Sequence, residues 1–338
     1  MEPIVSGDYK VLVTGANGQL GTAIKKSLIK KIKDKYIFVT REEFDICDKH
    51  MMRNYLLEHK DIKVIINCAA YTNVRKAEEE KELAMRVNCD AVKDLAELCK
   101  EFDIFLIHFG TDYMYQYNNT APINEDICYF SFDDNWFGQY YWHSINTYGL
   151  SKLGGVKRMF DTFPLENHKP PKFVVIVVSW LFSEFGNNFA NTMFNKILND
   201  EECGVVCTEI GSPTYAVDLA EFVIDSIEER GCNFVGYGEP FVNSQRKCII
   251  NFSNLGIASW YDVAKYLEVC LNRGELQHNS IKPRLEPFDN IKRPNYSVLD
   301  TTRLLKLYDK KPYVRHWTSA IDSYVFNRFS LKVLENQE

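Results

Sequence analysis

Short apolar runs alternate with segments of helical spacing along the first half of the chain. The run Lys10–Thr14 closes on glycines, and Gln19–Ile32 repeats apolar residues at helical intervals, which predicts a strand, a tight turn and a helix. Alternation of this kind indicates parallel strands joined by right-handed crossovers. The same rhythm continues through Tyr36–Thr40 (strand), Asp48–His59 (helix), Val64–Cys68 (strand), Glu80–Glu101 (helix) and Ile104–Phe109 (strand).

The second half begins with a helix from Tyr148 to about Phe163 and a nearly continuous apolar run, Phe173–Trp180, typical of a strand buried on both faces. The pattern then loosens. We therefore predict an α/β fold with a doubly wound parallel (Rossmann) sheet in residues 1–180, and in 181–338 a smaller mixed α/β cap interleaved with the last strands. The cap segments are Asn187–Asn199, Ala216–Glu229, Ile249–Ser253 and Ser259–Leu271.

The first strand-to-helix turn carries three glycines, Gly15, Gly18 and Gly21. In a dinucleotide site the first allows the tight turn, the second lets the backbone approach a pyrophosphate, and the third permits close packing of helix and strand. Glycines also punctuate such turns for structural reasons alone. The position at the first βα turn favours the dinucleotide, with residues 1–180 as an NAD(P)-binding domain.

The second strand ends at Thr40-Arg41, where an acid would favour NAD and an Arg accommodates a 2′-phosphate. Arg41 therefore favours NADPH, with NADH as an alternative. Asp45 and Ile46 close the same loop and are candidates for framing the adenine. The structural alternatives are a surface ion pair for Arg41 and a helix N-cap region for Asp45-Ile46.

Tyr148 and Lys152 stand four residues apart, so a helix places the phenol and the ammonium on one face. Tyr261 and Lys265 have the same spacing, and we interpret that pair as an ordinary helix face. Position separates the two pairs, because the strand Ile104–Phe109 leads into Thr111 at the edge where a doubly wound sheet binds its cofactor.

Reduction of a carbonyl needs a hydride source, a proton donor and a second group that holds the oxygen, and Tyr148, Lys152 and Thr111 meet the last two needs. A phenolate at neutral pH would require the Tyr148 pKa to fall by roughly three units. One nearby cation contributes about one to three units. The reducing direction needs a protonated phenol instead, so the residues are compatible with a reductase.

The 338 residues are 46% hydrophobic and 25% charged, within the range of soluble globular proteins. A net charge of −6 argues against binding to nucleic acid, but it leaves room for a small anionic ligand. The chain has no apolar run of membrane-spanning length and no signal-peptide pattern at its start, so we expect a cytoplasmic protein. The ten cysteines lack zinc-site spacing, and we expect no metal.

Several longer segments together resemble the extended short-chain dehydrogenases/reductases, and within them the dTDP-4-dehydrorhamnose reductases. The likeness spans nearly the whole chain. Its pieces are Thr14–Gly21, Ile66–Thr72, Thr111–Tyr113, Tyr148–Lys152, Ser179-Trp180, Phe185–Phe189, Gly211–Tyr215, Asn251–Asn254, Ser259–Asp262 and Arg293–Ser297.

The resemblance implies reduction of the 4-keto group of a nucleotide-linked 6-deoxy sugar by NADPH or NADH, giving a nucleotide-L-rhamnose type of product. It implies a catalytic set of Thr111, Tyr148 and Lys152. Further residues would bind the cofactor: Gly15, Asn17, Gly18, Gln19, Leu20, Ala69, Ala70, Tyr71 and Thr72. The substrate would meet Tyr113, Trp180, Asn188, Phe189 and Arg293.

The chain departs from the family pattern at three places. Gln116-Tyr117 replaces Asp-Gly, Arg75 replaces an acid, and about a dozen extra residues, rich in aromatic side chains, precede Tyr148. This insertion, within 127–143, either packs on the surface or on a second copy in a homodimer, or lies beside the sugar pocket.

The second placement would bring in Cys128 or His143 for a 3-epimerase step. Two alternatives thus remain open besides the 4-reductase. One is a bifunctional 3-epimerase/4-reductase acting on a UDP-linked sugar, acetamido sugars included. The other is a non-catalytic nucleotide-binding regulatory subunit, like that of methionine adenosyltransferase.

Overall fold

The computed structural model describes residues 4–28, 32–115, 120–125, 146–163, 171–234, 248–272 and 279–335. Its centre is a six-stranded sheet in the order β10-β5-β4-β3-β1-β2, and every pairing in it is parallel. The predicted doubly wound Rossmann sheet is thereby confirmed. The strands are β1 (Lys10–Thr14), β2 (Tyr36–Phe38), β3 (Ile62–Asn67), β4 (Phe105–Thr111), β5 (Phe173–Val178) and β10 (Ile249–Phe252).

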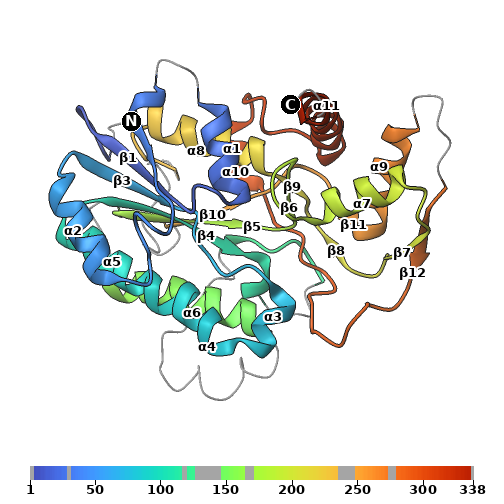
Figure 1. The fold of residues 1–338 in the computed structure, drawn as a ribbon, viewed down its shortest axis with the longest axis horizontal. Coiled ribbons are helices and arrows are strands. Elements are labelled where there is room, and N and C mark those ends of the chain that lie inside the picture. Colours follow the sequence, from blue (N-terminus) through green and yellow to red (C-terminus); the bar gives the residue numbers. More distant parts are fainter. Residues whose placement is uncertain are drawn as a thin grey trace.

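Helices cover both faces of this sheet (Figure 1). One face carries α1 (Gln19–Ser27), α8 (Ala216–Glu228) and α10 (Thr302–Tyr308), and the other carries α2 (Lys49–Glu58), α5 (Ala91–Glu101) and α6 (Thr147–Thr162). The chain passes from β1 to β2 in one direction and from β3 to β4 and β5 in the other. The crevice where such a sheet binds its ligand therefore opens at the carboxyl ends of β1 and β3.

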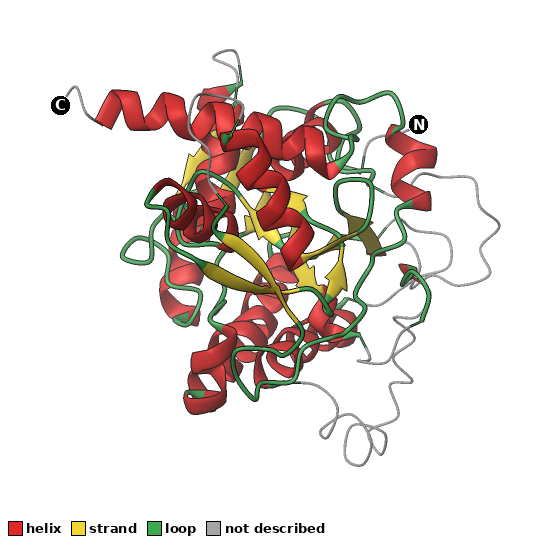
Figure 2. Cartoon of the chain, turned by 90° about the vertical axis from the view of Figure 1, so that its right-hand side faces the viewer, coloured by secondary structure: helices red, strands yellow, loops and turns green. Residues whose placement is uncertain are grey.

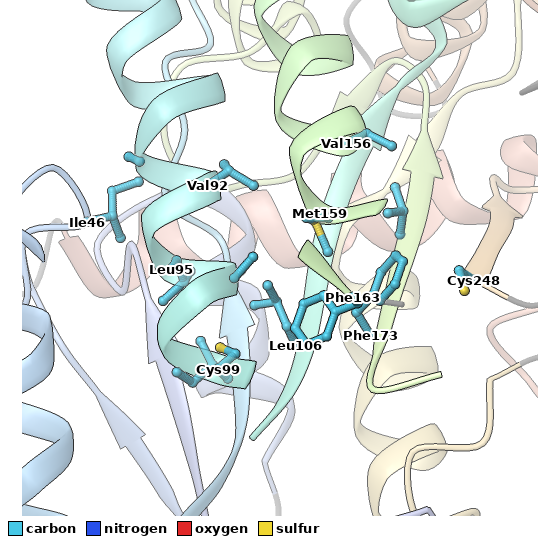
Figure 3. Close-up of a cluster of buried hydrophobic side chains, with 14 of the residues drawn as sticks. Ile46, Val92, Leu95, Cys99, Leu106, Val156, Met159, Phe163, Phe173 and Cys248 are labelled. Carbon is cyan, nitrogen blue, oxygen red and sulfur yellow. The ribbon is translucent and has the colours of Figure 1, made fainter. Parts of the chain in front are cut away.

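Figure 3 shows how the core on the α5 and α6 side is filled. Leu95 of α5 and Met159 of α6 point between the helices toward Leu106 of β4, and all three side chains are fully buried. The Phe173 ring stacks on Phe163 at a centroid distance of 5.1 Å. This packing fixes the position of α6, the helix that carries Tyr148.

The single helix predicted for Glu80–Glu101 is wrong in its middle. The structure has α4 (Lys81–Met85), a π-helical turn η2 (Arg86–Asp90) and then α5, and a further helix α3 (Val74–Glu79) precedes them. A π turn inserts one residue into the helical ladder, and apolar periodicity over 22 or so positions does not reveal it. The first helix is also shorter than predicted, since α1 ends at Ser27.

The smaller lobe packs a third hydrophobic cluster among α7 (Phe189–Leu198), α9 (Trp260–Leu271) and α11 (Trp317–Glu335). Figure 2 views the molecule from this side. Short strand pairs complete the lobe: β6 (Leu181–Phe182) with β9 (Thr214–Tyr215), β7 (Cys203–Val206) with β12 (Ile281–Arg284), and β8 (Ile210–Gly211) with β11 (Ala258–Ser259). The division at residue 180 stays a prediction; β10, α8 and α10, which follow it in sequence, lie in the layers of the main sheet.

Candidate active site

The glycine turn after β1 is shaped by two close backbone approaches. Gly15 has φ +62°, and a Cβ there would lie 2.7 Å from the amide nitrogen of Ala69. A Cβ at Gly21 would overlap the carbonyl oxygen of Gly15. Gly18 is the N-cap of α1, and no side chain caps this helix. The free amides and the positive end of the helix dipole suit an anionic group such as a pyrophosphate.

The residues after Gly18 have different surroundings. Asn17 is exposed, whereas Leu20 is buried. Gln19 accepts a hydrogen bond of 2.8 Å from Nδ2 of Asn188, the residue whose side chain caps α7. Asn188, assigned from the resemblance to the substrate, is thus directly joined to the turn assigned to the cofactor.

The loop after β2 holds an ion pair. Arg41 Nε lies 2.9 Å from Asp45 Oδ2, and the Arg41 side chain is 76% exposed. Ile46 is buried in the core beside Phe44. The N-cap of α2 is Asp48, whose side chain accepts from His50 and Met51, rather than Asp45-Ile46. The contributions of Arg41, Asp45 and Ile46 to cofactor binding stay predictions.

Asn88 in the π turn holds the segment that follows β3, a role that the sequence analysis did not predict. Its Oδ1 accepts from the Tyr71 amide at 2.9 Å, and its Nδ2 donates to the Tyr71 carbonyl at 2.8 Å and to Ser151 of α6 at 3.0 Å. The Ala69 amide donates to Thr14 at 3.4 Å, while Ala70 is half-buried and Thr72 exposed. Asn88 therefore ties the predicted cofactor segment to the catalytic helix.

Tyr148 lies in the first turn of α6. Asn146 caps this helix by accepting from the Gly149 amide at 2.8 Å, and Glu78 of α3 accepts from the Thr147 amide at 2.7 Å. The Tyr148 side chain is partly exposed, but protein atoms surround its hydroxyl. This burial raises the Tyr148 pKa to about 12, and a hydrogen bond with Thr111 acts in the opposite direction. A phenol with this pKa is protonated at neutral pH and is suited to donate a proton.

Lys152 follows one helical turn later and is almost fully buried. Burial lowers the pKa of its ammonium to about 8, although the nearby Cys68 favours the charge. A second neighbour is His108 of β4, whose pKa is lowered by burial and by the charge of Lys152. His108 joins Asn67, which accepts from Thr14 at 2.7 Å, in a buried polar chain across β4, β3 and β1.

Thr111 ends β4 and contacts an acid that the sequence analysis did not single out. Its hydroxyl donates to Oδ1 of Asp112 at 3.0 Å and accepts from the Tyr113 amide at 3.3 Å. Asp112 is 2% exposed, and burial raises the pKa of its carboxyl to about 6, against hydrogen bonds from Ser297 and Thr111. The structure thus brings Thr111, Tyr148 and Lys152 to one place, with a buried carboxyl behind them.

Aromatic rings surround three of the residues predicted to meet the substrate. Tyr113 meets Tyr148 edge-on at a centroid distance of 5.8 Å, and burial raises its pKa. Trp180, at φ +47°, stacks on Trp260 at 3.7 Å, and Phe189 leans on the same Trp260 ring at 4.6 Å. Trp260 was not predicted as a site residue, because its position looked like the start of an ordinary helix.

A cavity of about 280 Å³ lies between these rings and a charged rim. Arg293 holds Asp289 through two contacts of 2.5 and 2.9 Å, and Arg75, which replaces the family's acid, lies 3.0 Å from the same carboxylate. These arginines keep the pKa of Asp289 below its usual range. The lining residues include Arg75, Phe189, Met193, Glu209, Trp260, Asp289 and Arg293.

The second Tyr and Lys pair occupies an ordinary helix face, as interpreted. Tyr261 and Lys265 lie on α9 in the smaller lobe, and Lys265 pairs with Glu268 at 2.5 Å. Gln116-Tyr117, Cys128, His143 and the aromatic insertion within 127–143 lie outside the described residues. The described ranges contain no group of three or more His, Cys, Asp or Glu side chains placed to hold a metal ion. Nor does any helix in them combine the length and apolar character needed to cross a membrane.

Comparison with known proteins now gives a family. The profile of the RmlD substrate binding domain matches residues 9–329. The chain belongs to this family. The dTDP-4-dehydrorhamnose reductase of Aggregatibacter actinomycetemcomitans is 30% identical over 317 residues, which are 92% of this chain and 97% of the relative.

Solved structures agree with this assignment. The dTDP-4-dehydrorhamnose reductase ortholog of Clostridium acetobutylicum is 30% identical, with a TM-score of 0.72 over 94% of this chain and 98% of the other. The Bacillus anthracis enzyme in complex with NADP is 26% identical, with a TM-score of 0.75 over 95% of this chain and 100% of the other. The resemblance found in the sequence is confirmed.

Proposed function

We propose that this protein reduces the 4-keto group of a nucleotide-linked 4-keto-6-deoxyhexose with NADPH. The observation that carries the proposal is the position of Tyr148 against Thr111, at the carboxyl end of β4 and on the same edge of the sheet as the glycine turn. Bound NADPH would supply the hydride. Family membership supports the same reaction, since the Aggregatibacter actinomycetemcomitans and Clostridium acetobutylicum relatives, each 30% identical, are named dTDP-4-dehydrorhamnose reductases.

The residues of the chain divide the remaining work. The α1 amides would hold the pyrophosphate of the bound cofactor, and the segment anchored by Asn88 would line its nicotinamide side. Tyr148, protonated because of its burial, donates its proton to the oxygen as negative charge develops there. Lys152 provides the nearby positive charge that stabilises the resulting phenolate.

The substrate is placed by the smaller lobe. Trp180 and Tyr113 border the sugar, and the cavity rimmed by Arg293 receives the nucleotide, whose phosphates suit an Arg fork. Arg41 would favour NADPH over NADH if it exchanged its ion pair with Asp45 for one with the 2′-phosphate.

The test is a panel of dTDP- and UDP-linked 4-keto-6-deoxy sugars, with NADPH oxidation followed by absorbance and the stereochemistry of the product determined. We expect turnover that Tyr148→Phe lowers by about 10² or more, since a positioned proton donor contributes about that much. Tyr261→Phe is the matched control and should be unaffected. Cofactor binding without turnover of any sugar in the panel would contradict the proposal and favour a regulatory subunit.

A further inference from the structure

Groups of the protein itself surround the Thr111 hydroxyl at all of its hydrogen-bonding positions. A threonine hydroxyl offers one donor and two lone pairs. The donor goes to Asp112 Oδ1 at 3.0 Å, and one lone pair takes the Tyr113 amide at 3.3 Å. One lone pair is left, and the Tyr148 hydroxyl lies near enough to Thr111 to form a hydrogen bond with it. In this arrangement Thr111 has no proton to offer a substrate.

The protonation state of Asp112 determines where the Thr111 hydroxyl points. As a carboxylate Asp112 can only accept, so it draws the Thr111 proton to itself, and Thr111 is left with only a lone pair to present to Tyr148. Once protonated on Oδ1, Asp112 becomes the donor, and both lone pairs of Thr111 are filled. The Thr111 proton and the Tyr148 proton are then both free to point at a third oxygen.

We propose that Asp112 is a positioning residue whose protonation turns the Thr111 hydroxyl from the carboxyl group toward the keto oxygen of the substrate. This role rests on the proposed function. The protonated form provides two donors to the oxygen that gains charge, and the ionised form provides fewer. Donors placed in this way act directly on the transition state of carbonyl reduction.

The surroundings of Asp112 suit such a change of protonation. The carboxyl is 2% exposed, and its Oδ2 meets no donor in hydrogen-bonding geometry among the described residues, so the shared proton is best held on Oδ1. Burial raises its pKa to about 6, opposed by Ser297 and Thr111. The other titratable groups facing it are Tyr148 of α6 and Tyr113 of its own turn, with Arg293 and Glu209 acting on Tyr113 from beyond.

The experiment measures kcat with saturating NADPH and sugar nucleotide from about pH 4.5 to about pH 7, where Lys152 stays almost fully protonated. In the wild type we expect kcat to fall as pH rises, by roughly tenfold across this range. Asp112→Asn cannot ionise and should show a flat profile. Thr111→Val should also lose the pH dependence, because Asp112 acts through the missing hydroxyl, whereas Thr111→Ser should keep it.

The variants separate positioning from a structural role. A merely structural Asp112 would lower stability when replaced but leave the pH profile of the folded enzyme unchanged. A falling profile that persists in Asp112→Asn, or in Thr111→Val, overturns the proposal. If Asp112→Asn does not fold, the contrast between Thr111→Val and Thr111→Ser decides the question alone. Absence of turnover in the wild type contradicts the proposed function itself. Turnover whose pH profile is the same in the wild type and in Asp112→Asn contradicts only the role of Asp112.

Discussion

Gly155 of α6 lies directly against the backbone of Asn88 in the π turn, so close that a Cβ at this glycine would overlap the Asn88 carbonyl oxygen. The contact brings the catalytic helix onto the segment that anchors Tyr71. Backbone cannot yield as a flexible side chain does, so the two elements would have to separate.

Gly155→Ala should therefore destabilise the protein by about 1–3 kcal/mol, the usual effect of overpacking. In an open helix position the same change would stabilise by up to about 1 kcal/mol. Urea unfolding measures the difference. Gly204→Ala on β7 is the control, because its nearest neighbours lie at 3.7 and 3.8 Å in Arg284. Equal stability of the two variants would contradict the close contact.

Lys152→Met should stabilise the protein while abolishing activity. The pKa of Lys152 falls from 10.5 to about 8 on folding, so the unfolded chain binds this proton more tightly. Its charge therefore opposes folding below about pH 8, and that penalty is relieved as pH rises toward 10.5. At pH 7 the gain in the free energy of unfolding is on the order of 3 kcal/mol.

The difference between wild type and Lys152→Met in denaturant unfolding should shrink as pH rises from neutral toward 10.5. Other groups titrate in both proteins and cancel in this comparison. A difference that stays constant with pH would show that the methionine acts through packing instead of through the charge.

Gly211→Ala should displace the Trp180 ring, which is proposed to border the sugar, and leave cofactor binding unchanged. A Cβ at Gly211 would lie 2.5 Å from Cε2 of Trp180, whose ring is stacked on Trp260 and cannot retreat toward it. We expect KM for the sugar nucleotide to rise by roughly tenfold, about 1.4 kcal/mol of binding. The Kd for NADPH, measured by fluorescence, should remain at the wild-type value. A parallel loss of NADPH affinity would contradict the assignment of Trp180 to the sugar alone.

The two arginines on Asp289 should differ in importance. Arg75 is 65% exposed, and a surface pair of this kind contributes at most about 1 kcal/mol. Arg293 is partly buried, makes two contacts with the carboxylate and faces Tyr113. Arg293→Ala should raise KM by roughly tenfold or more, and Arg75→Ala by roughly threefold or less. Similar effects of the two changes would contradict this ranking.

Local patterns predicted the main sheet well because each strand of the first half is a short buried run between helices of regular spacing. β1 has the bounds expected for it, Lys10–Thr14, and the Tyr148 helix differs by one residue at each end. Identification of the catalytic pair needed the fold as well, since Tyr261 and Lys265 have the same spacing.

The features that the sequence did not predict depend on contacts between distant residues. Asn88 looks like any polar position of a helix until Tyr71 and Ser151 are placed around it. Asp112 was visible beside Thr111, but only burial distinguishes it from a solvated acid. Trp260 acquires its place from Trp180, which is 80 positions away in the chain.

The hydrogen bond from Asn188 to Gln19 crosses between the two lobes, from the cap of α7 to the glycine turn. A ligand that displaces Gln19 removes one of three acceptors of the Asn188 amide, which keeps the carbonyls of Ser183 and Phe185, and a ligand that recruits Asn188 releases Gln19. The free energy needed to break this hydrogen bond therefore enters the binding free energy of both ligands. Each must then change the other's affinity by the same factor. Binding of the cofactor and binding of the sugar nucleotide are thereby coupled through a single amide pair.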